Sequence, residues 1–344
     1  MIAARCSPKE TAKAAGLLYV SDEEPGIERR TNGSGFTYWF PSGRAVRGKR
    51  QKERIAALAI PPAWTEVWIC REPTGHLQAT GYDDRGRKQF LYHPILVETS
   101  SSQAFDRHDE FGDALIRIRR KADSHLRSRR SQRDRLLALV VRLLDLTGMR
   151  IGGEEYLAEN GSHDLTTLRR RHVRFEGNTA VIRYSGKGGK PQRLRIDDTS
   201  ALRVLRTAVE AGSDGLFLHE TDEGPRPVRA REVNDYLRED SAGDVTTKDF
   251  RTWLASAWEA AELFEEREEG DSGRRGRNIT GVVKRIAQRS ANTPKVCRSS
   301  YVDPRLLLAY EAGEFLNFFS TLQRRTQKWL RCEDRILRHA LARF

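Results

Sequence analysis

The sequence has few cysteines and no long apolar segment. Its four cysteines stand at Cys6, Cys70, Cys297 and Cys332, with no Cys-x-x-Cys pair and no accompanying histidine cluster. This spacing argues against a zinc site, and isolated thiols are typical of a reducing compartment. No run approaches the length of a membrane span, and the first ten residues lack the apolar core of a signal peptide. We therefore expect a cytoplasmic protein without a metal site and without membrane association.

Positive charge is in excess. The chain of 344 residues has 61 Lys and Arg against 48 Asp and Glu, a net charge of +13. Such an excess favours a polyanionic partner. A soluble basic protein without such a partner is the plainer alternative. A basic membrane-surface protein is a further one, but the sequence has no amphipathic basic helix with an aromatic face.

Turn signals and alternating apolar residues predict a small, mainly β domain over residues 1–98. Residues 1–30 are polar and are expected to be irregular. A hairpin is predicted around the turn at Asp83–Gly86, since two β-prone runs flank an Asp/Gly turn. The expected strands occupy residues 35–40, 66–70, 76–81 and 88–92, with a short helix over residues 49–58.

Residues 99–104, small and polar, are predicted to be a linker. Helical periodicity dominates residues 105–344, which are predicted to form a larger, mainly α domain with a three-stranded antiparallel sheet. The fold class is thus α+β. Residues 265–277 are expected to be a mobile loop. Helices are expected from 110, over 132–146, 199–209, 230–237, 249–261 and 281–289, from Pro304 and in the tail, and strands over 172–175, 179–184 and 193–196.

Five residues of the larger domain form a candidate catalytic set. Arg150 follows the helix breaker Thr147-Gly148, Lys187 lies at a hairpin tip, and Arg251 is expected in the first turn of a helix. Asn292 and Tyr301 lie in a short polar segment. A lone tyrosine is more often a packing residue. A phenol with a pKa of about 10 becomes a nucleophile only where cations and hydrogen-bond donors surround its target.

The segments that carry these residues resemble the type IB DNA topoisomerases, particularly their bacterial and poxvirus branch. They occur in that family's order and are Thr147–Tyr156, Ser185–Gly188, Lys248–Thr252, and Asn292 with Ser299–Tyr301. The resemblance implies that Tyr301 attacks one DNA strand and forms a 3′-phosphotyrosyl link. The duplex then rotates, and the freed 5′-hydroxyl reseals the strand. Neither ATP nor a metal is needed, because the covalent link keeps the phosphoester energy.

The chemistry of the set agrees with these roles. Arg150 and Arg251 can each donate two parallel hydrogen bonds to the pentacoordinate phosphate. Lys187, with its pKa lowered by neighbouring cations, suits the general acid for the leaving alkoxide. Asn292, where many relatives have His, is expected to donate to a nonbridging oxygen. Lys190 is a rival to Lys187, and Cys297 is interpreted as a buried thiol rather than a nucleophile.

The resemblance also implies contacts with double-stranded DNA. The candidates are Gln89, Tyr92, Tyr156, Lys190 and Lys248. Gln89 could pair with adenine, and Tyr92 is as readily a cross-strand packing residue. Thr166 and Thr167 are weaker candidates for phosphate contacts. The arginines between residues 127 and 135 are either phosphate contacts or a solvated face, with phosphate contacts favoured.

Two other functions compete with this one. A tyrosine recombinase has similar chemistry, but its family typically has His-x-x-Arg where this chain has Lys248-Asp249-Phe250-Arg251. A non-catalytic, basic DNA-binding protein would not need Tyr301. The loop Gly186–Lys190 lacks the Ser or Thr of a nucleotide-binding loop and leads into a strand. We expect a monomer whose two lobes form a clamp, lined with Lys and Arg, around duplex DNA in the nucleoid.

Overall fold

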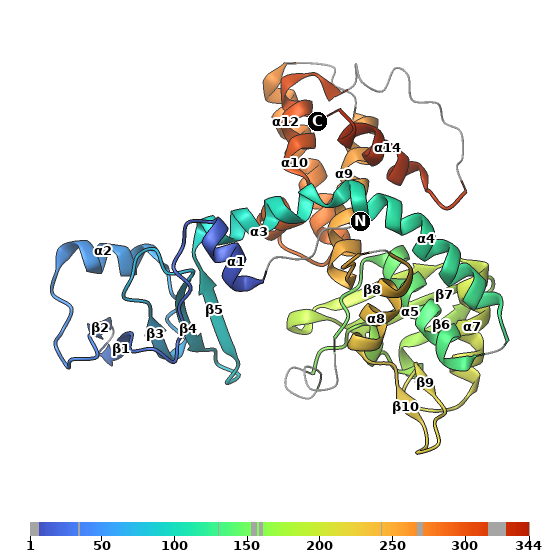
Figure 1. The fold of residues 1–344 in the computed structure, drawn as a ribbon, viewed down its shortest axis with the longest axis horizontal. Coiled ribbons are helices and arrows are strands. Elements are labelled where there is room, and N and C mark those ends of the chain that lie inside the picture. Colours follow the sequence, from blue (N-terminus) through green and yellow to red (C-terminus); the bar gives the residue numbers. More distant parts are fainter. Residues whose placement is uncertain are drawn as a thin grey trace. The chain divides into compact units, whose positions relative to one another are not determined.

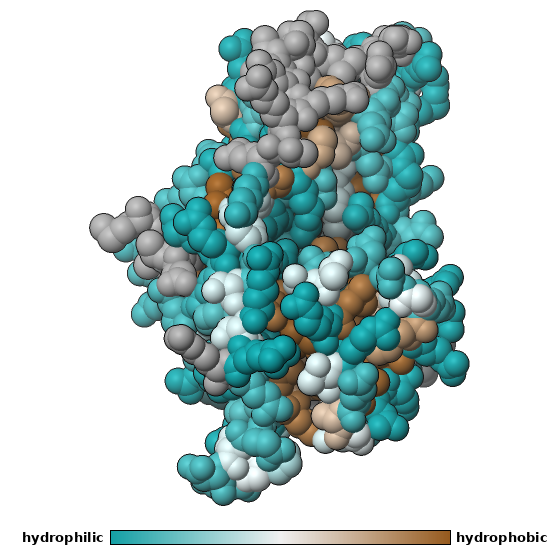
Figure 2. All heavy atoms as spheres, turned by 90° about the vertical axis from the view of Figure 1, so that its right-hand side faces the viewer, coloured by the Kyte–Doolittle hydropathy of each residue, from teal (hydrophilic) through white to brown (hydrophobic). Residues whose placement is uncertain are grey.

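The computed structural model describes residues 7–33, 35–129, 131–152, 157, 161–241, 243–266, 271–315 and 328–343. The chain divides into a smaller unit, Arg5–Gln103, and a larger unit that begins at Ala104 (Figure 1). Within the described residues, no helix is long and apolar enough to cross a membrane. The face shown in Figure 2 is covered mostly by hydrophilic side chains, as the composition predicts.

The smaller unit is built on a five-stranded antiparallel sheet with the strand order β2-β1-β3-β4-β5. Alternating side chains of β1, β3 and β4 enter a small core with Ile55 of α2, and Ile27, Ile69 and Ala79 are fully buried there. The predicted hairpin of β4 and β5 is confirmed. The elements are α1 (Pro8–Ala14), β1 (Ile27–Asn32), β2 (Gly35–Trp39), α2 (Lys49–Ala57), β3 (Thr65–Ile69), β4 (Leu77–Tyr82) and β5 (Lys88–Tyr92).

Two expectations for this part of the chain are wrong. Residues 1–30 are not irregular where they are described, because they include α1 and most of β1. Helix α1 begins with a capping box: the backbone N–H of Glu10 donates to Oγ of Ser7, and the N–H of Ser7 donates to the Glu10 carboxylate. This Ser-x-x-Glu pattern was readable in the sequence.

The predicted linker is helical. Residues 99–104 lie inside α3 (Pro94–Asp106), which begins with a proline at a position that suits it. The hydroxyl of Ser101 donates to the carbonyl of Val97 one turn earlier, at 2.9 Å. A serine-rich segment therefore accepts helical geometry here, although serine bonds as readily to non-helical backbone.

The larger unit packs its helices around α5 (Gln132–Thr147) and α9 (Thr247–Glu266), most of whose residues are buried. Trp253 and Phe250 of α9 are among the largest fully buried side chains. The other helices are α4 (His108–Arg127), α7 (Thr199–Glu210), α8 (Ala230–Ser241), α10 (Ser272–Arg289), α11 (Pro294–Ser300), α12 (Pro304–Ala312) and α14 (Cys332–Leu341), with short 3₁₀ turns η1 (Leu165–Thr167), η2 (Arg170–His172) and η3 (Lys187–Gly189).

An antiparallel sheet with the order β6-β7-β8 lies in this unit. Its strands are β6 (Val173–Glu176), β7 (Thr179–Ser185) and β8 (Pro191–Ile196), and a second, two-stranded sheet joins β9 (Leu218–His219) to β10 (Arg226–Pro227). The turn η3 connects β7 to β8 and carries Lys187 at its first position.

Two further boundaries differ from the predictions. Helix α9 begins at Thr247, two residues earlier than expected, so Arg251 is its fifth residue and lies in the second turn rather than the first. Residues 271–277 are not a loop: Asp271 caps α10 by accepting a hydrogen bond from the N–H of Arg274 at 2.8 Å, and the helix runs from Ser272. Residues 267–270 of the predicted loop lie outside the described residues, as do residues 316–327 of the predicted helical tail.

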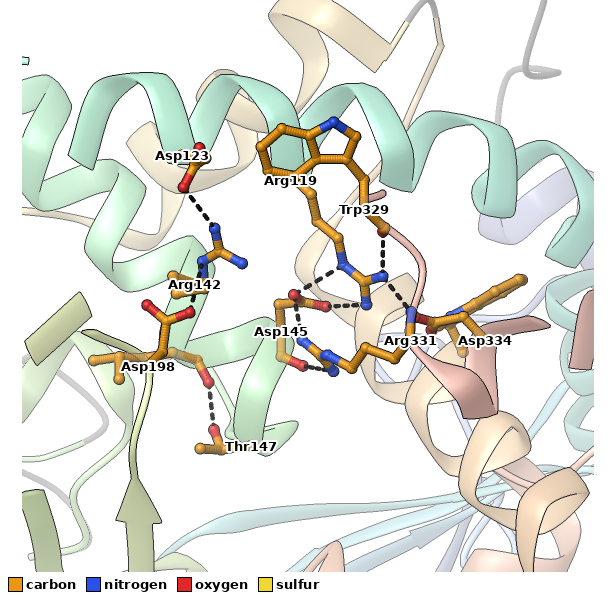
Figure 3. A network of polar contacts seen from close by, with 11 residues as sticks. Arg119, Asp123, Arg142, Asp145, Thr147, Asp198, Trp329, Arg331 and Asp334 are labelled. Atoms are coloured by element: carbon orange, nitrogen blue, oxygen red, sulfur yellow. Dashed lines mark hydrogen bonds and ion pairs between the residues drawn. The ribbon is translucent and has the colours of Figure 1, made fainter. Parts of the chain in front are cut away.

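A buried ion network joins the two ends of the larger unit (Figure 3). Arg119 of α4 donates two hydrogen bonds to the Asp145 carboxylate of α5, at 3.0 and 2.9 Å, and one to Asp334 of α14, at 2.6 Å. Arg331 donates to Asp145 at 2.6 Å, and the indole N–H of Trp253 donates to Asp334 at 2.7 Å. The network therefore fixes α4, α5, α9 and α14 against one another.

Candidate active site

Tyr301 lies at the end of α11, a helix that Thr293 caps and Pro294 begins. The tyrosine is only 8% exposed. Its hydroxyl accepts a hydrogen bond from Nη1 of Arg251 at 2.8 Å, and the guanidinium carbon of Arg251 stands 4.7 Å from the centre of its ring. The phenol is thus in direct contact with a cation, as a tyrosine nucleophile requires.

Arg251 is itself held rigidly. Its Nε donates to the carbonyl of Gly148 at 3.1 Å. Gly148 ends α5 in the left-handed conformation, with φ of 65°, which glycine adopts at low cost. Burial lowers the pKa of Arg251, Arg150 lowers it further, and Tyr301 opposes both effects. The guanidinium stays charged, because even a lowered arginine pKa lies far above neutrality.

Arg150 reaches the same site from just beyond α5. Its Nη2 donates to Oδ1 of Asn292 at 3.1 Å. The amide nitrogen of Asn292 donates to the carbonyl and to the hydroxyl of Ser290, both at 3.1 Å. Both ends of the Asn292 amide are therefore engaged within the protein. The expectation that this amide donates to a phosphate stays a prediction, and the contact that the structure shows is the one that holds Arg150.

Lys187 is exposed at the tip between β7 and β8. Partial desolvation lowers the pKa of its ammonium group, and Arg150 and then Arg251 contribute in the same direction, against Tyr301 and Asp164. The neighbouring Gly188 and Gly189 both have φ of 75°, so the tight tip depends on glycine. A lysine with a lowered pKa gives up its proton more readily.

The sequence analysis missed one charged residue of the site, Asp164. It lines a cavity of about 350 Å³ together with Arg150, Lys187, Lys248 and Arg251. Burial raises the pKa of the Asp164 carboxyl, against the opposing effect of the surrounding cations. A Cβ atom on Gly152 would overlap Oδ2 of Asp164, so glycine is needed there. No motif indicated Asp164, since its place depends on a fold that brings residues 150–152 beside it.

The segment around Asp164 also joins Arg150 to the end of β7, two residues before Lys187. The N–H of His163 donates to the carbonyl of Ser185 at 2.7 Å, and the N–H of Leu165 donates to the carbonyl of Arg150 at 2.9 Å. The neighbouring Thr166 and Thr167 are buried, and their hydroxyls donate to the carbonyls of Gly152 and Asp164. These hydrogen bonds stabilise the loop, and the interpretation of the two threonines as phosphate contacts stays a prediction.

The other candidates of the larger unit have different surroundings. Lys248 and Lys190 are exposed, and Lys248 borders the cavity. Cys297 is fully buried, as predicted, and burial raises the pKa of its thiol to about 12. Two arginines of the run at 127–135 pair with carboxylates, Arg127 with Asp123 and Arg133 with Glu232. Tyr156 lies outside the described residues.

In the smaller unit, β5 carries the two predicted DNA contacts. Nε2 of Gln89 donates to the Asp83 carboxylate at 3.0 Å, which leaves its second N–H and its amide oxygen for another partner. Tyr92 is 45% exposed, and its ring is stacked against that of Phe90, with 6.2 Å between centroids. Phe90, which the sequence analysis did not consider, is equally exposed, so the two rings form one aromatic surface.

No group of three or more His, Cys, Asp or Glu side chains suited to a metal ion occurs among the described residues. The cations that line the cavity, one of which bonds to the Tyr301 hydroxyl, are matched to a phosphodiester, whose negative charge grows during transesterification.

Sequence comparison agrees with this chemistry. Residues 94–304 match the family described as eukaryotic DNA topoisomerase I, catalytic core, and residues 35–83 match the bacterial DNA topoisomerase IB N-terminal domain. The first match covers more than half of the chain, so the chain belongs to the type IB DNA topoisomerases, which are isomerases.

Viral relatives share most of its length. The DNA topoisomerase 1B of Acanthamoeba polyphaga mimivirus is 28% identical over 294 residues, which are 83% of this chain and 88% of the relative. The DNA topoisomerase 1B of vaccinia virus (strain Copenhagen) is 19% identical over 280 residues, 78% of this chain and 84% of the relative.

Proposed function

We propose that this topoisomerase relaxes supercoiled DNA through a transient 3′-phosphotyrosyl link at Tyr301, without ATP or a metal. The observation that carries the proposal is the contact of the Tyr301 hydroxyl with Arg251, 2.8 Å long, beside a cavity that Arg150 and Lys187 also line. A phosphate in that cavity would have a nucleophile, two guanidinium groups and a general acid around it.

In the cleavage step, the phenol oxygen of Tyr301 bonds to phosphorus and the bond to the 5′ oxygen breaks. The phenol proton leaves to water, and Lys187 gives a proton to the departing 5′ oxygen. Arg150 and Arg251 stabilise the extra charge of the pentacoordinate phosphate. Asn292 contributes by keeping Arg150 oriented, since the two side chains are 3.1 Å apart.

Religation reverses these steps. The 5′-hydroxyl attacks phosphorus, Lys187 recovers its proton, and the phenolate of Tyr301 leaves. Between the two reactions the duplex rotates about the intact strand and loses supercoils. No high-energy cofactor enters, because one phosphodiester is exchanged for another of similar energy.

The two units would close as a clamp on duplex DNA, acting as a monomer in the nucleoid of the cytoplasm. The excess of 61 basic over 48 acidic residues supports a largely electrostatic grip. Lys190, Lys248 and Tyr156 would contact the backbone from the larger unit, and Gln89 and Tyr92 would contact it from β5.

The decisive assay compares wild type with Tyr301→Phe on negatively supercoiled plasmid, in EDTA and without ATP. Wild type should relax the plasmid, and SDS should trap protein covalently on the 3′ end of the broken strand. Tyr301→Phe should bind DNA and do neither. Relaxation by both proteins would refute the assignment of the nucleophile. If neither protein relaxed DNA although both bound it, a strand-exchange assay would test for a recombinase.

A further inference from the structure

Helix α9 contacts the tyrosine segment at three points. Arg251 donates to the Tyr301 hydroxyl, as described above. One to two turns later, Oγ of Ser256 donates to the backbone carbonyl of Tyr301 at 3.2 Å, and Oε2 of Glu259 accepts a hydrogen bond from the N–H of Asp303 at 2.8 Å. Ser256 and Glu259 are both fully buried.

We propose that Ser256 and Glu259 are positioning residues for the nucleophile, with Glu259 acting as a neutral carboxylic acid. This inference rests on the proposed role of Tyr301. It assigns to α9 a second task besides carrying Arg251: the helix fixes the tyrosine at its hydroxyl, at its carbonyl and at the amide two residues later. Nucleophile and guanidinium are then placed by one rigid element.

The tyrosine needs this support because its own helix is short. Helix α11 has seven residues, too few to be rigid without packing, and Tyr301 follows it with φ of −132°. Asp303 begins the next element by capping α12, where its carboxylate accepts from the N–H of Arg305 at 3.0 Å. The contact from Glu259 thus joins the start of α12 to α9 directly behind Tyr301.

The charges around Asp303 explain why Glu259 is neutral. The Asp303 carboxylate lies 2.7 Å from Nη2 of Arg305 and 3.3 Å from Nδ1 of His108. These partners overcome the effect of burial and lower the pKa of Asp303 to about 2. No ion pair joins Glu259 to a cation among the described residues. Burial, followed by the charge of Asp303, raises its pKa well above the ordinary value, and the hydrogen bond from the N–H of Asp303 and the charge of Arg298 oppose this only in part. Two neighbouring buried carboxyls do not both ionise when only one is paired.

An acid in this place is costly to keep. Oε1 of Glu259 is buried without a hydrogen-bond partner in the described structure. Burying such an oxygen is unfavourable, and an apolar side chain of similar size would pack there without that cost. An apolar side chain would, however, leave the N–H of Asp303 unpaired and would release the segment behind the tyrosine. The acceptor on Glu259 is therefore the feature that the site requires.

The test uses single-turnover cleavage of a duplex whose cut fragment dissociates, with the full-length variants Glu259→Ala, Glu259→Gln and Ser256→Ala. Thr252→Ala is the matched control, because Thr252 is a buried residue of α9 whose hydroxyl bonds only within that helix. Each variant is also made in the Tyr301→Phe background to measure the Kd for DNA without cleavage. A second substrate carries a sulfur at the 5′ bridging position, a leaving group that needs no general acid.

We expect Glu259→Ala to cleave up to about 100-fold more slowly on both substrates with an unchanged Kd, the scale of a nucleophile misplaced by about 1 Å. Ser256→Ala should show a smaller loss of the same kind. Glu259→Gln should cleave like wild type, since its amide oxygen can accept the same hydrogen bond. Lys187→Ala, by contrast, should be slow on the oxygen substrate and recover on the sulfur substrate.

Several outcomes would overturn the inference. Wild-type cleavage by folded Glu259→Ala and Ser256→Ala would show that the contacts do not position Tyr301. If the cleavage rate of Glu259→Ala recovers on the sulfur substrate, the substitution slows departure of the leaving group and does not misplace the nucleophile. If Glu259→Ala does not fold, Glu259→Gln decides the question. A Glu259→Gln variant that folds but cleaves slowly refutes the claim that Glu259 acts as a neutral hydrogen-bond acceptor. Cleavage by Tyr301→Phe would instead refute the proposed function, and this result does not depend on the results for the Glu259 and Ser256 variants.

Discussion

Removing Asp145 should destabilise the larger unit far more than the loss of an ordinary ion pair. Arg119 and Asp145 are 4% and 2% exposed, and Asp334 is fully buried. With Arg331, the network holds two positive and two negative charges, so it is neutral. Burial raises the pKa of Asp145, but Arg119 and Arg331 outweigh it and bring the pKa below its ordinary value. The carboxylate is therefore ionised at neutral pH.

In Asp145→Ala, Arg119 keeps Asp334 but loses a partner that accepts two of its hydrogen bonds, and the buried set gains a net positive charge. Stranding a buried charge in this way costs about 3–5 kcal/mol. The unfolding free energy of a natural protein is only about 5–15 kcal/mol.

Hydrogen exchange of peptides from α4 and α5 measures this effect in the larger unit alone. The control is Asp235→Ala, whose carboxylate pairs with Arg231 and Arg238 on the surface and is 51% exposed. An exposed pair of this kind contributes about 0–1 kcal/mol. Equal losses in Asp145→Ala and Asp235→Ala would refute the reasoning.

Three further predictions concern the site. First, Asp164→Asn in the Tyr301→Phe background should bind duplex DNA more tightly than Tyr301→Phe alone. The ratio of the two Kd values should grow as the pH rises through the raised pKa of Asp164, because only the ionised carboxylate repels phosphate. A ratio independent of pH would contradict this. Second, Gly152→Ala should slow cleavage because its Cβ displaces the Asp164 carboxylate, and adding Asp164→Ala should restore part of the rate. If the double variant is as slow as Gly152→Ala, the loss comes from a changed backbone conformation at residue 152 and not from the carboxylate. Third, the free energy of unfolding of wild type, measured in urea, should fall by about 1.4 kcal/mol per pH unit relative to that of Glu259→Gln as the pH rises above the ordinary carboxyl pKa of 4.5. The reason is that the folded protein holds a proton on Glu259 that unfolding releases. Parallel pH profiles for the two proteins would mean that Glu259 is ionised in the fold.

The elements that the sequence predicted well have strong local signals. The hairpin of β4 and β5 flanks an Asp/Gly turn, α5 has a continuous apolar stripe, and Pro304 begins α12 as predicted. Each of these signals acts over a few residues and needs no tertiary partner. The candidates Arg150, Lys187, Arg251, Asn292 and Tyr301 were found through the family resemblance, and the structure brings them together.

The misses depend on contacts between distant residues. Helix α3 contains three consecutive serines, so its local preference for helix is weak. Asp164 lies at the cavity between two neighbours that are held by distant residues: the N–H of His163 donates to the carbonyl of Ser185, and the N–H of Leu165 donates to the carbonyl of Arg150. Glu259 appeared as one more polar residue of a helix, and its burial follows from α12 packing across α9. No pattern of residue spacing along the chain predicts such tertiary contacts.

The ion network of Figure 3 also has a consequence for the order in which the enzyme is made. Arg119 is synthesised 215 residues before Asp334, its partner on α14. Until Asp334 leaves the ribosome, Arg119 has an incomplete set of acceptors and the indole N–H of Trp253, on the helix that carries Arg251, has none from α14. The catalytic helix thus receives this anchor only after residue 334 has been made. A chain interrupted before that point would contain Tyr301, but its catalytic helix would lack the contact with Asp334. Such an incomplete chain should therefore cleave DNA poorly.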